Sequence, residues 1–127
     1  MLLIDLDELS TAALAQSLAS RGAHVFFTAA PHVARRLSQE CYFDLVVIDD
    51  RLDGEAHPSL ADVIARDGHR CVVLSVGAER RALQTGEITV RGGIRRPLEA
   101  ERVFTLSVVA GQDGRYEEIR RFLDLSP

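Results

Sequence analysis

The sequence predicts a single α/β domain in which five parallel strands form a central sheet and helices cover both of its faces. Three observations indicate this fold. The chain has 127 residues, of which 46% are hydrophobic and 27% charged, and these values are ordinary for one globular domain. Short apolar runs alternate along the chain with segments of helical periodicity. The runs at 45–48 and 71–74 are apolar throughout, which is typical of strands buried on both faces.

The expected strands are read from these apolar runs and from β-branched and aromatic residues. They are residues 2–4, 24–28, 44–49 and 71–76, followed by a fifth strand at 88–90 or at 93–94. The pattern alone does not choose between the last two positions.

The first two helices have recognisable starts and stops. Asp7, Ser10 and Thr11 are each able to cap a first helix, in which residues 9, 12–14 and 18 recur at helical spacing before Gly22 ends it. Pro31 suits the first turn of a second helix, with Val33, Leu37 and Cys41 on one face.

The remaining helices are less regular. We expect a short helix around residues 60–64, a weak polar helix at 78–85, and a longer helix from Pro97 through Val109. Residues 111–114 break that helix, and residues 116–125 read as a further amphipathic helix. The expected organisation is therefore a domain at 1–110 and a C-terminal extension helix at 111–127.

Composition excludes several classes of function. All 15 basic residues are arginine, so chemistry that needs a lysine amine, such as a Schiff base, is excluded. The net charge is −4 without a basic block, so we expect no direct binding of nucleic acid. No apolar run approaches the roughly 18 residues that cross a bilayer. The two cysteines fit neither a disulfide framework nor a zinc site, which favours a reducing cytoplasm.

Polar residues follow the expected strands where parallel strands end at one edge of the sheet. Asp5 and Asp7 follow the first strand, Asp49 ends the third, Ser75 ends the fourth and Arg96 follows the fifth. Carboxylates that converge in one cleft repel each other unless a hard cation such as Mg²⁺ compensates. A carboxylate is also a nucleophile toward phosphorus. The pattern therefore suggests phosphoryl transfer to an aspartate, assisted by a metal.

In these features, residues 1–110 resemble the receiver domain of bacterial two-component response regulators, which has a flavodoxin-like (βα)5 fold. The matching features are the acids after the first strand, the run Asp-Leu-Val-Val-Ile-Asp, the serine after the fourth strand and the Arg-Pro pair after the fifth. The resemblance implies that Asp49 is the phosphoacceptor. It also implies that Ser75 and Arg96 hold the phosphoryl group, and that Asp5, Asp49 and the Arg51 carbonyl bind Mg²⁺, with Asp7 as a possible addition. The Arg96–Pro97 bond would then be cis, as is usual in the family.

Four positions depart from the family's pattern. Leu6 replaces the second metal-binding acid, and the loss of a carboxylate is expected to weaken Mg²⁺ binding. Arg96 replaces a lysine, and its planar guanidinium presents a different geometry. Asp53 stands where a proline is common. Gly93 falls at the aromatic switch position, so the coupling of a hydroxyl to a rotating ring is missing.

Three hypotheses follow. The first is an atypical receiver in a phosphorelay, which takes a phosphoryl group from a histidine kinase or phosphotransfer protein. It would signal to an output domain or regulator, or to a second copy of itself, and its only catalysis would be its own phosphorylation and dephosphorylation at Asp49. The second is a pseudo-receiver that binds proteins without phosphorylation. The third, a flavodoxin-like binder of a small molecule, is disfavoured because the loop after the first strand contains no glycine. For Asp5, Asp7 and Asp49, ordinary capping or loop roles remain open alternatives, as do a backbone-bonded hydroxyl for Ser75 and a surface or salt-bridge role for Arg96.

Overall fold

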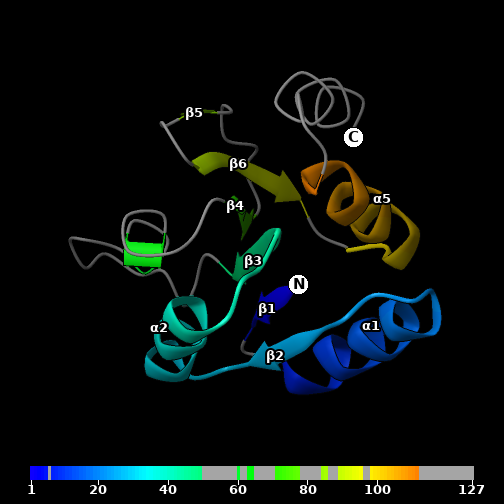
Figure 1. The fold of residues 1–127 in the computed structure, drawn as a ribbon. Coiled ribbons are helices and arrows are strands. Elements are labelled where there is room, and N and C mark those ends of the chain that lie inside the picture. Colours follow the sequence, from blue (N-terminus) through cyan, green and yellow to red (C-terminus); the bar gives the residue numbers. More distant parts are fainter. Residues whose placement is uncertain are drawn as a thin grey trace.

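A computed structural model describes residues 1–5, 7–49, 60, 63–64, 71–77, 84–85, 89–95 and 98–111. Its elements, in chain order, are β1 (Leu2–Ile4), α1 (Glu8–Ser20), β2 (Phe26–Thr28), α2 (Pro31–Glu40), β3 (Leu45–Asp49), β4 (Cys71–Gly77), β5 (Gln84–Thr85), β6 (Thr89–Arg95) and α5 (Ala100–Ala110) (Figure 1). Leu60, Val63 and Ile64 are helical, as expected. The expected extension helix at 116–125 and most of the expected helix at 78–85 lie outside the described residues.

The sheet has the strand order β2-β1-β3-β4-β6-β5. Its first five strands are parallel, which confirms the predicted sheet and its doubly wound order. Of the two candidate positions for the fifth strand, residues 89–90 of the first and residues 93–94 of the second belong to β6, while residue 88 lies outside the described residues. This strand pairs with β4 from Cys71↔Thr89 to Gly77↔Arg95.

One expectation about this edge of the sheet was wrong. Gln84 and Thr85 end the segment expected to be a polar helix, but they form the short strand β5, which runs antiparallel to β6. The segment offered no apolar helical stripe to oppose this pairing. The backbone of these two residues bonds instead to that of Val90 and Arg91.

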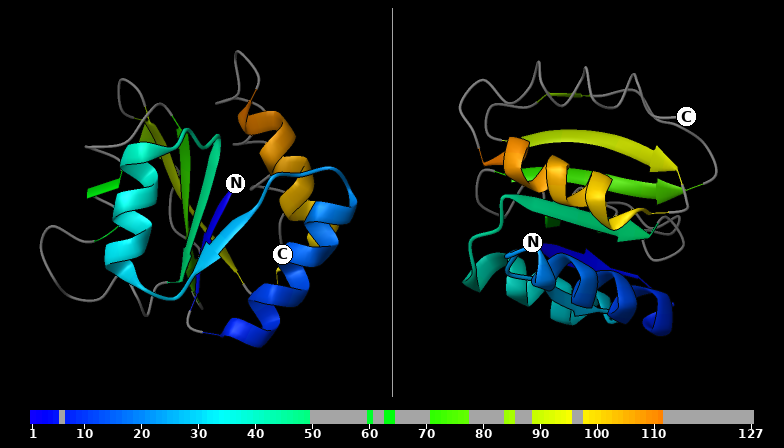
Figure 2. Two further views of the ribbon diagram at one scale, coloured as in Figure 1. Left: turned by 60° about the horizontal axis from the view of Figure 1, so that its bottom comes forward. Right: turned by 90° about the vertical axis from the view of Figure 1, so that its right-hand side faces the viewer.

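Helices cover both faces of the sheet (Figure 2). On one face, α1 and α5 pack against alternate strand residues, which include Leu3, Val47 and Leu74. On the other face, α2 packs against the intervening residues, which include Leu2, Ile48 and Val73. Because successive strand residues point to opposite faces, these two apolar layers account for strands without polar alternation.

The helix ends follow the expected signals. Asp7 caps α1, its side chain accepting a hydrogen bond from the Ser10 N–H. Gly22 follows α1 with a φ of 97°, a left-handed conformation that glycine adopts without strain. Pro31 begins α2, whereas α5 begins at Ala100, three residues after Pro97.

The buried stripes of α1 and α2 differ from those expected. In α1, Leu9 is 88% exposed, while Ala15 and Leu18 are buried. In α2, Val33 is exposed, while Ala34 and Ser38 are buried. Apolar spacing marked the helices correctly, but small residues such as alanine and serine fit closer to the sheet than the larger side chains do.

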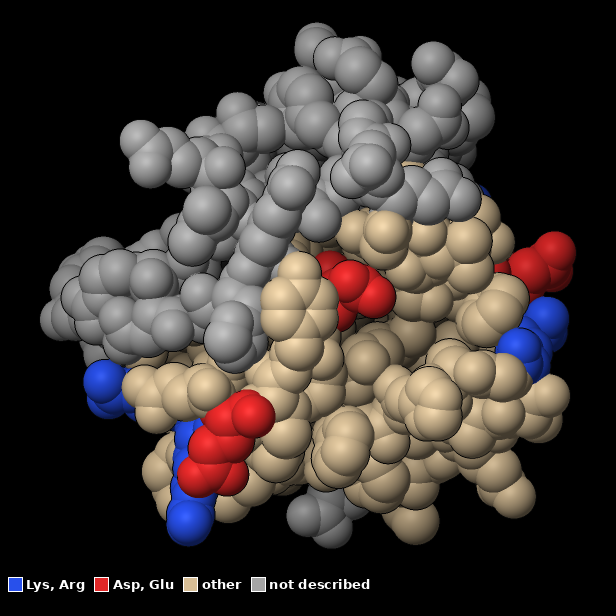
Figure 3. Space-filling view, in the orientation of Figure 1, with Lys and Arg blue, Asp and Glu red and all other residues tan. Residues whose placement is uncertain are grey.

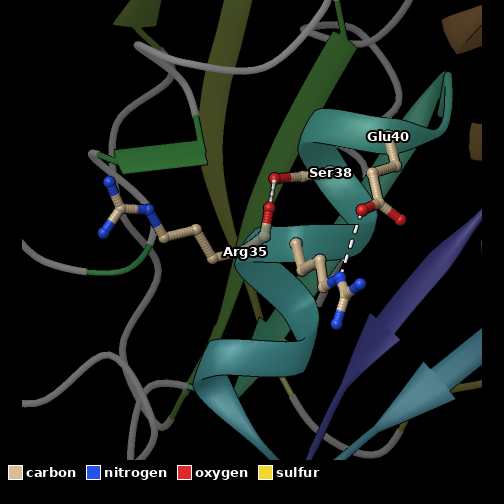
Figure 4. Close-up of polar contacts among 4 residues, drawn as sticks. Arg35, Ser38 and Glu40 are labelled. Carbon is tan, nitrogen blue, oxygen red and sulfur yellow. Dashed lines mark hydrogen bonds and ion pairs between the residues drawn. The ribbon is translucent and has the colours of Figure 1, made fainter.

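The outer surfaces of α1 and α2 have different chemistry. From Leu9 to Ser20, α1 has no charged residue. On α2, the Arg36 guanidinium pairs with the Glu40 carboxylate at 3.1 Å, and the buried Ser38 hydroxyl donates to the Arg35 carbonyl at 2.8 Å (Figure 4). The ion pair is solvent-exposed, so it adds little to stability.

Candidate functional site

Two buried carboxylates lie side by side at the carboxyl edge of the sheet. In the β1–β3 ladder Ile4 is opposite Ile48, so the next step along both strands brings Asp5 beside Asp49. Neighbouring strands are about 4.8 Å apart. Only 8% of Asp5 and 2% of Asp49 is exposed. The two acids predicted from distant parts of the sequence therefore meet at one position.

The turn after β1 holds the Asp5 carboxylate in place. Its backbone N–H donates to the Thr28 carbonyl at 3.1 Å, which extends the pairing of β1 with β2. Its Oδ1 accepts the Asp7 N–H at 3.0 Å. These bonds direct the side chain of Asp5 along the turn that leads into α1.

Asp7 begins α1. Its Oδ1 accepts the Ser10 N–H at 3.1 Å, and its carbonyl accepts the Thr11 hydroxyl at 2.7 Å. The capping role left open for Asp7 is therefore observed. Its role as a metal ligand stays a prediction. In that role the carboxylate would bind a metal while its Oδ1 also accepts the capping hydrogen bond.

Ser75 lies in β4, one step before the level of Asp49. It is opposite Ile48, whereas Asp49 is opposite Val76. The Ser75 side chain is 5% exposed. Strand alternation places it on the face of Val73, whereas Asp49 shares the face of Val47. Its hydroxyl therefore starts from the other face of the sheet, and its role at the phosphoryl group stays a prediction.

Gly93 on β6 is directly opposite Ser75. At this level of the sheet the serine therefore has a neighbour with no side chain. In the family pattern an aromatic ring at this position would couple to the serine hydroxyl. Here the residue opposite Ser75 is a glycine, as the sequence indicated.

The other predicted site residues lie outside the described part of the chain. They are Leu6, Arg51, Asp53, Arg96 and Pro97, so the predicted Arg51 carbonyl ligand, the Arg96 contact and the cis bond stay predictions. Among the residues that are described, no three His, Cys, Asp or Glu side chains gather into a metal-binding group.

The pair of Asp5 and Asp49 has the chemistry of a partial Mg²⁺ site. Mg²⁺ is commonly held by one or two carboxylates, with water and phosphate oxygens as its other ligands. Two adjacent buried carboxylates repel each other, and a divalent cation relieves that repulsion. The residues present therefore fit Mg²⁺, with fewer side-chain ligands than a three-carboxylate site offers.

Asp44, which lies at the other end of β3, is not among the site residues predicted from the sequence. Together with Met1, His24 and Tyr42 it lines a pocket of about 400 Å³ at the amino ends of the strands. An acid directly before an apolar strand is the only sequence signal of this position, and such acids are common.

Comparison with known proteins places the fold. No family model and no curated protein matches the chain. A response regulator receiver domain protein from Bacillus halodurans is 18% identical with a TM-score of 0.56, over 88% of this chain and 95% of the other. A CheY-like response regulator receiver domain protein from Methanospirillum hungatei is 17% identical with a TM-score of 0.52, over 97% and 92%.

The strand order and the helices on both faces define a doubly wound, flavodoxin-like α/β protein. More narrowly, the chain has the fold of response regulator receiver domains, as its sequence suggested. Within the described residues, no helix combines the length and apolar character needed to cross a membrane.

Proposed function

We propose that this chain is an atypical receiver domain that accepts a phosphoryl group on Asp49. The observation that carries the proposal is the adjacency of Asp5 and Asp49, two buried carboxylates at the carboxyl edge of a receiver-type sheet. Ligands of open α/β sheets collect at this edge.

In the proposed reaction, an Asp49 carboxylate oxygen attacks the phosphorus of a phosphohistidine on a histidine kinase or phosphotransfer protein. The P–N bond breaks as the P–O bond forms, and the histidine is released. Mg²⁺, when bound, would neutralise charge on the phosphoryl oxygens. Asp5 and Asp49 would hold it, with the Arg51 carbonyl and Asp7 as further candidates, and Arg96 and Ser75 would donate hydrogen bonds to the phosphoryl group.

The wider assignment follows from the same proposal. Residues 1–110 would form the receiver unit and residues 111–127 an extension. The phosphorylated state would act through a protein surface on an output domain or regulator. Cys41 and Cys71 are not joined in a disulfide, which suits a reducing cytoplasm.

Phosphorylation is tested with acetyl phosphate, Mg²⁺ and intact-mass measurement. Phosphoryl transfer releases acetate and should raise the protein mass by one phosphoryl group. Asp49→Asn should abolish the change, because the amide is not a nucleophile for this reaction. Asp44→Asn, at the other end of the same strand, is the matched control and should label normally. If wild-type protein gains no phosphoryl mass, the proposal is wrong.

One observation favours a second candidate function, a pseudo-receiver that binds proteins without phosphorylation. Gly93 opposite Ser75 removes the ring that would report a movement of the hydroxyl. This candidate predicts a partner complex with the same affinity for wild type and Asp49→Asn, in the presence and absence of acetyl phosphate. A phosphorylation-dependent change in that affinity would exclude it.

A further inference from the structure

The strand β2 forms one outer edge of the sheet. It pairs with β1 on one side, and among the described residues no strand lies on its other side. In the left view of Figure 2, β2 lies at the front of the molecule, between α1 and α2. A sheet edge whose backbone groups are unpaired is able to pair with a further strand.

The backbone of Phe27 is directed toward this free edge. The Phe26 N–H donates to the Met1 carbonyl at 2.9 Å, and the Thr28 carbonyl accepts the Asp5 N–H at 3.1 Å. The backbone groups of successive strand residues point to opposite sides of the strand, so those of Phe27 point away from β1. Within the described part of the chain, its N–H and carbonyl have no hydrogen-bond partner.

The side chains along this edge are aromatic and half-exposed. Phe26 is 49% exposed and Phe27 47% exposed, although phenylalanine is among the residues most often buried. Phe26 is on the α2 face of the sheet, where its ring centroid lies 5.7 Å from that of Phe43. Phe27 is opposite Leu3, on the face that α1 covers. Apolar surface therefore reaches the free edge on both faces of the sheet.

This edge lacks the features that usually prevent strands from pairing between molecules. Proteins protect free edges with charged side chains, with proline or with a bulge. Residues 22–30 include no aspartate, glutamate, arginine or proline, and the register of β2 with β1 runs without a bulge. Figure 3 shows uncharged described residues across the lower middle of the molecule, where Figure 1 places β2 and α1. Charged side chains lie to either side of this area.

A second copy of the chain has the geometry that this edge requires. In an antiparallel pair, opposite residues whose backbone groups face each other exchange two N–H···O bonds. A twofold axis beside Phe27 would place this residue opposite its own copy, so that the outward N–H of each meets the outward carbonyl of the other. Such an axis brings identical groups together. Because residues 22–30 include no acid and no arginine, it would bring no like charges together along β2.

We propose that two copies of this chain pair antiparallel along β2 and form one continuous sheet, with Phe27 of one copy opposite Phe27 of the other. The two Phe27 rings then lie on the same face of the joined sheet as a cross-strand aromatic pair. Since β2 has only three residues, the contact is small and the dimer is weak, with a Kd of about 100 µM. This pairing does not depend on phosphoryl transfer at Asp49, so either proposal can fail without the other.

Sedimentation equilibrium between about 10 µM and about 1 mM protein measures the association. Wild type should change from monomer to dimer over this range. Phe27→Lys should raise Kd by at least about 10-fold, because it places two positive charges opposite each other. Val108→Lys is the matched control, since Val108 on α5 is apolar and also 47% exposed, and it should change Kd by less than about 2-fold. A wild type that stays monomeric, or equal effects of the two variants, would overturn the proposal.

The backbone pairing itself is tested on the unmodified protein, so this measurement decides the matter even if Phe27→Lys does not fold. Amide proton shifts of ¹⁵N-labelled protein are followed over the same range of concentration. The Phe27 amide should move downfield as its N–H becomes hydrogen-bonded, with the Kd that sedimentation gives. The Val108 amide, which lies on α5, should not move. A dimer that forms without a shift of the Phe27 amide would use another surface and would contradict the proposal.

Discussion

The two ends of β3 carry an aspartate each, in opposite surroundings. Asp49, at the carboxyl end, is 2% exposed and lies beside Asp5. Asp44, at the amino end, is solvent-exposed and lies near the Met1 ammonium. At one end two carboxylates lie together and are buried, whereas at the other end a single carboxylate faces solvent near the chain's own ammonium group. The two aspartates at the ends of β3 therefore differ in burial and in the charges that lie near them.

The largest predicted effect on stability comes from a substitution in the middle of the sheet, because the sheet positions both ends of β3. Leu74 is fully buried on β4 and pairs with Val47. Leu74→Ala should lower the free energy of unfolding by about 3 kcal/mol, through lost burial and the cavity that remains. Urea denaturation measures this change. A loss well below 1 kcal/mol would mean that the sheet centre is not packed as described.

Neutralising Asp49 and Asp44 in turn should change the stability of the protein by different amounts. Asp49→Asn should change the free energy of unfolding by about 1 kcal/mol, because it removes one of two adjacent buried carboxylates. Asp44→Asn should leave it unchanged or lower it by up to about 0.5 kcal/mol, because it removes an exposed favourable charge. Thermal or urea denaturation without metal compares them. Equal effects of the two variants would contradict the contrast drawn between the ends of the strand.

The effect of Mg²⁺ on stability should also differ between the Asp49 and Asp44 variants. If Asp5 and Asp49 hold the ion, 10 Kd of Mg²⁺ should stabilise wild type by about 1.4 kcal/mol, since the ion binds only the folded state. Asp49→Asn should lose most of this gain, while Asp44→Asn should keep it. Denaturation in matched NaCl controls for general charge screening. An equal Mg²⁺ gain in both variants would place the ion elsewhere.

The amino end should show a pH dependence of its own. The pKa of the Met1 amine is lowered by burial in the folded state from its usual value of 8.0. Between the lowered pKa and 8.0 the unfolded chain binds more protons, so stability should rise with pH across this window. Asp44→Asn removes the opposing influence and should enlarge the rise.

An N-terminally acetylated chain is the control for this pH effect. It lacks the titrating amine, so the difference between its stability profile and that of the unmodified protein isolates this group. A difference that does not vary with pH would show that burial does not perturb the amine.

The smallest predicted effect lies away from both ends. Arg36→Ala removes the exposed ion pair with Glu40 on α2 and should change stability by less than about 0.5 kcal/mol. Urea denaturation, compared with Glu40→Ala and the double variant, gives the coupling energy. A coupling above about 1 kcal/mol would show that this surface contributes more than its exposure implies.

Much of the fold could be predicted because the strands are buried on both faces. Leu45–Ile48 and Cys71–Leu74 are continuous apolar runs, and such runs reveal a parallel sheet with little ambiguity. The stop at Gly22 is also a local signal, which explains why the end of α1 was predicted, whereas Asp7, Ser10 and Thr11 were equally good caps and left its start open.

What the sequence could not predict depends on tertiary contact. The exposure of Leu9 and Val33 follows from how closely α1 and α2 approach the sheet. The spacing of apolar residues along the sequence does not predict that distance. The pairing of Gln84 and Thr85 with β6 is likewise a tertiary choice in a segment without a strong local preference. At the site, adjacency of Asp5 and Asp49 followed from strand order, whereas the level and face of Ser75 required the register.

The uncharged stretch of α1 from Leu9 to Ser20 has a consequence for how any partner would approach it. Because residues 9–20 include no ionisable side chain, contacts on this helix would be nearly insensitive to ionic strength. This stretch contributes no long-range steering of its own, so encounters that depend on it alone should proceed at the unassisted rate of about 10⁵–10⁶ M⁻¹s⁻¹. Recognition on this surface would therefore depend on shape and on the slow departure of a bound partner.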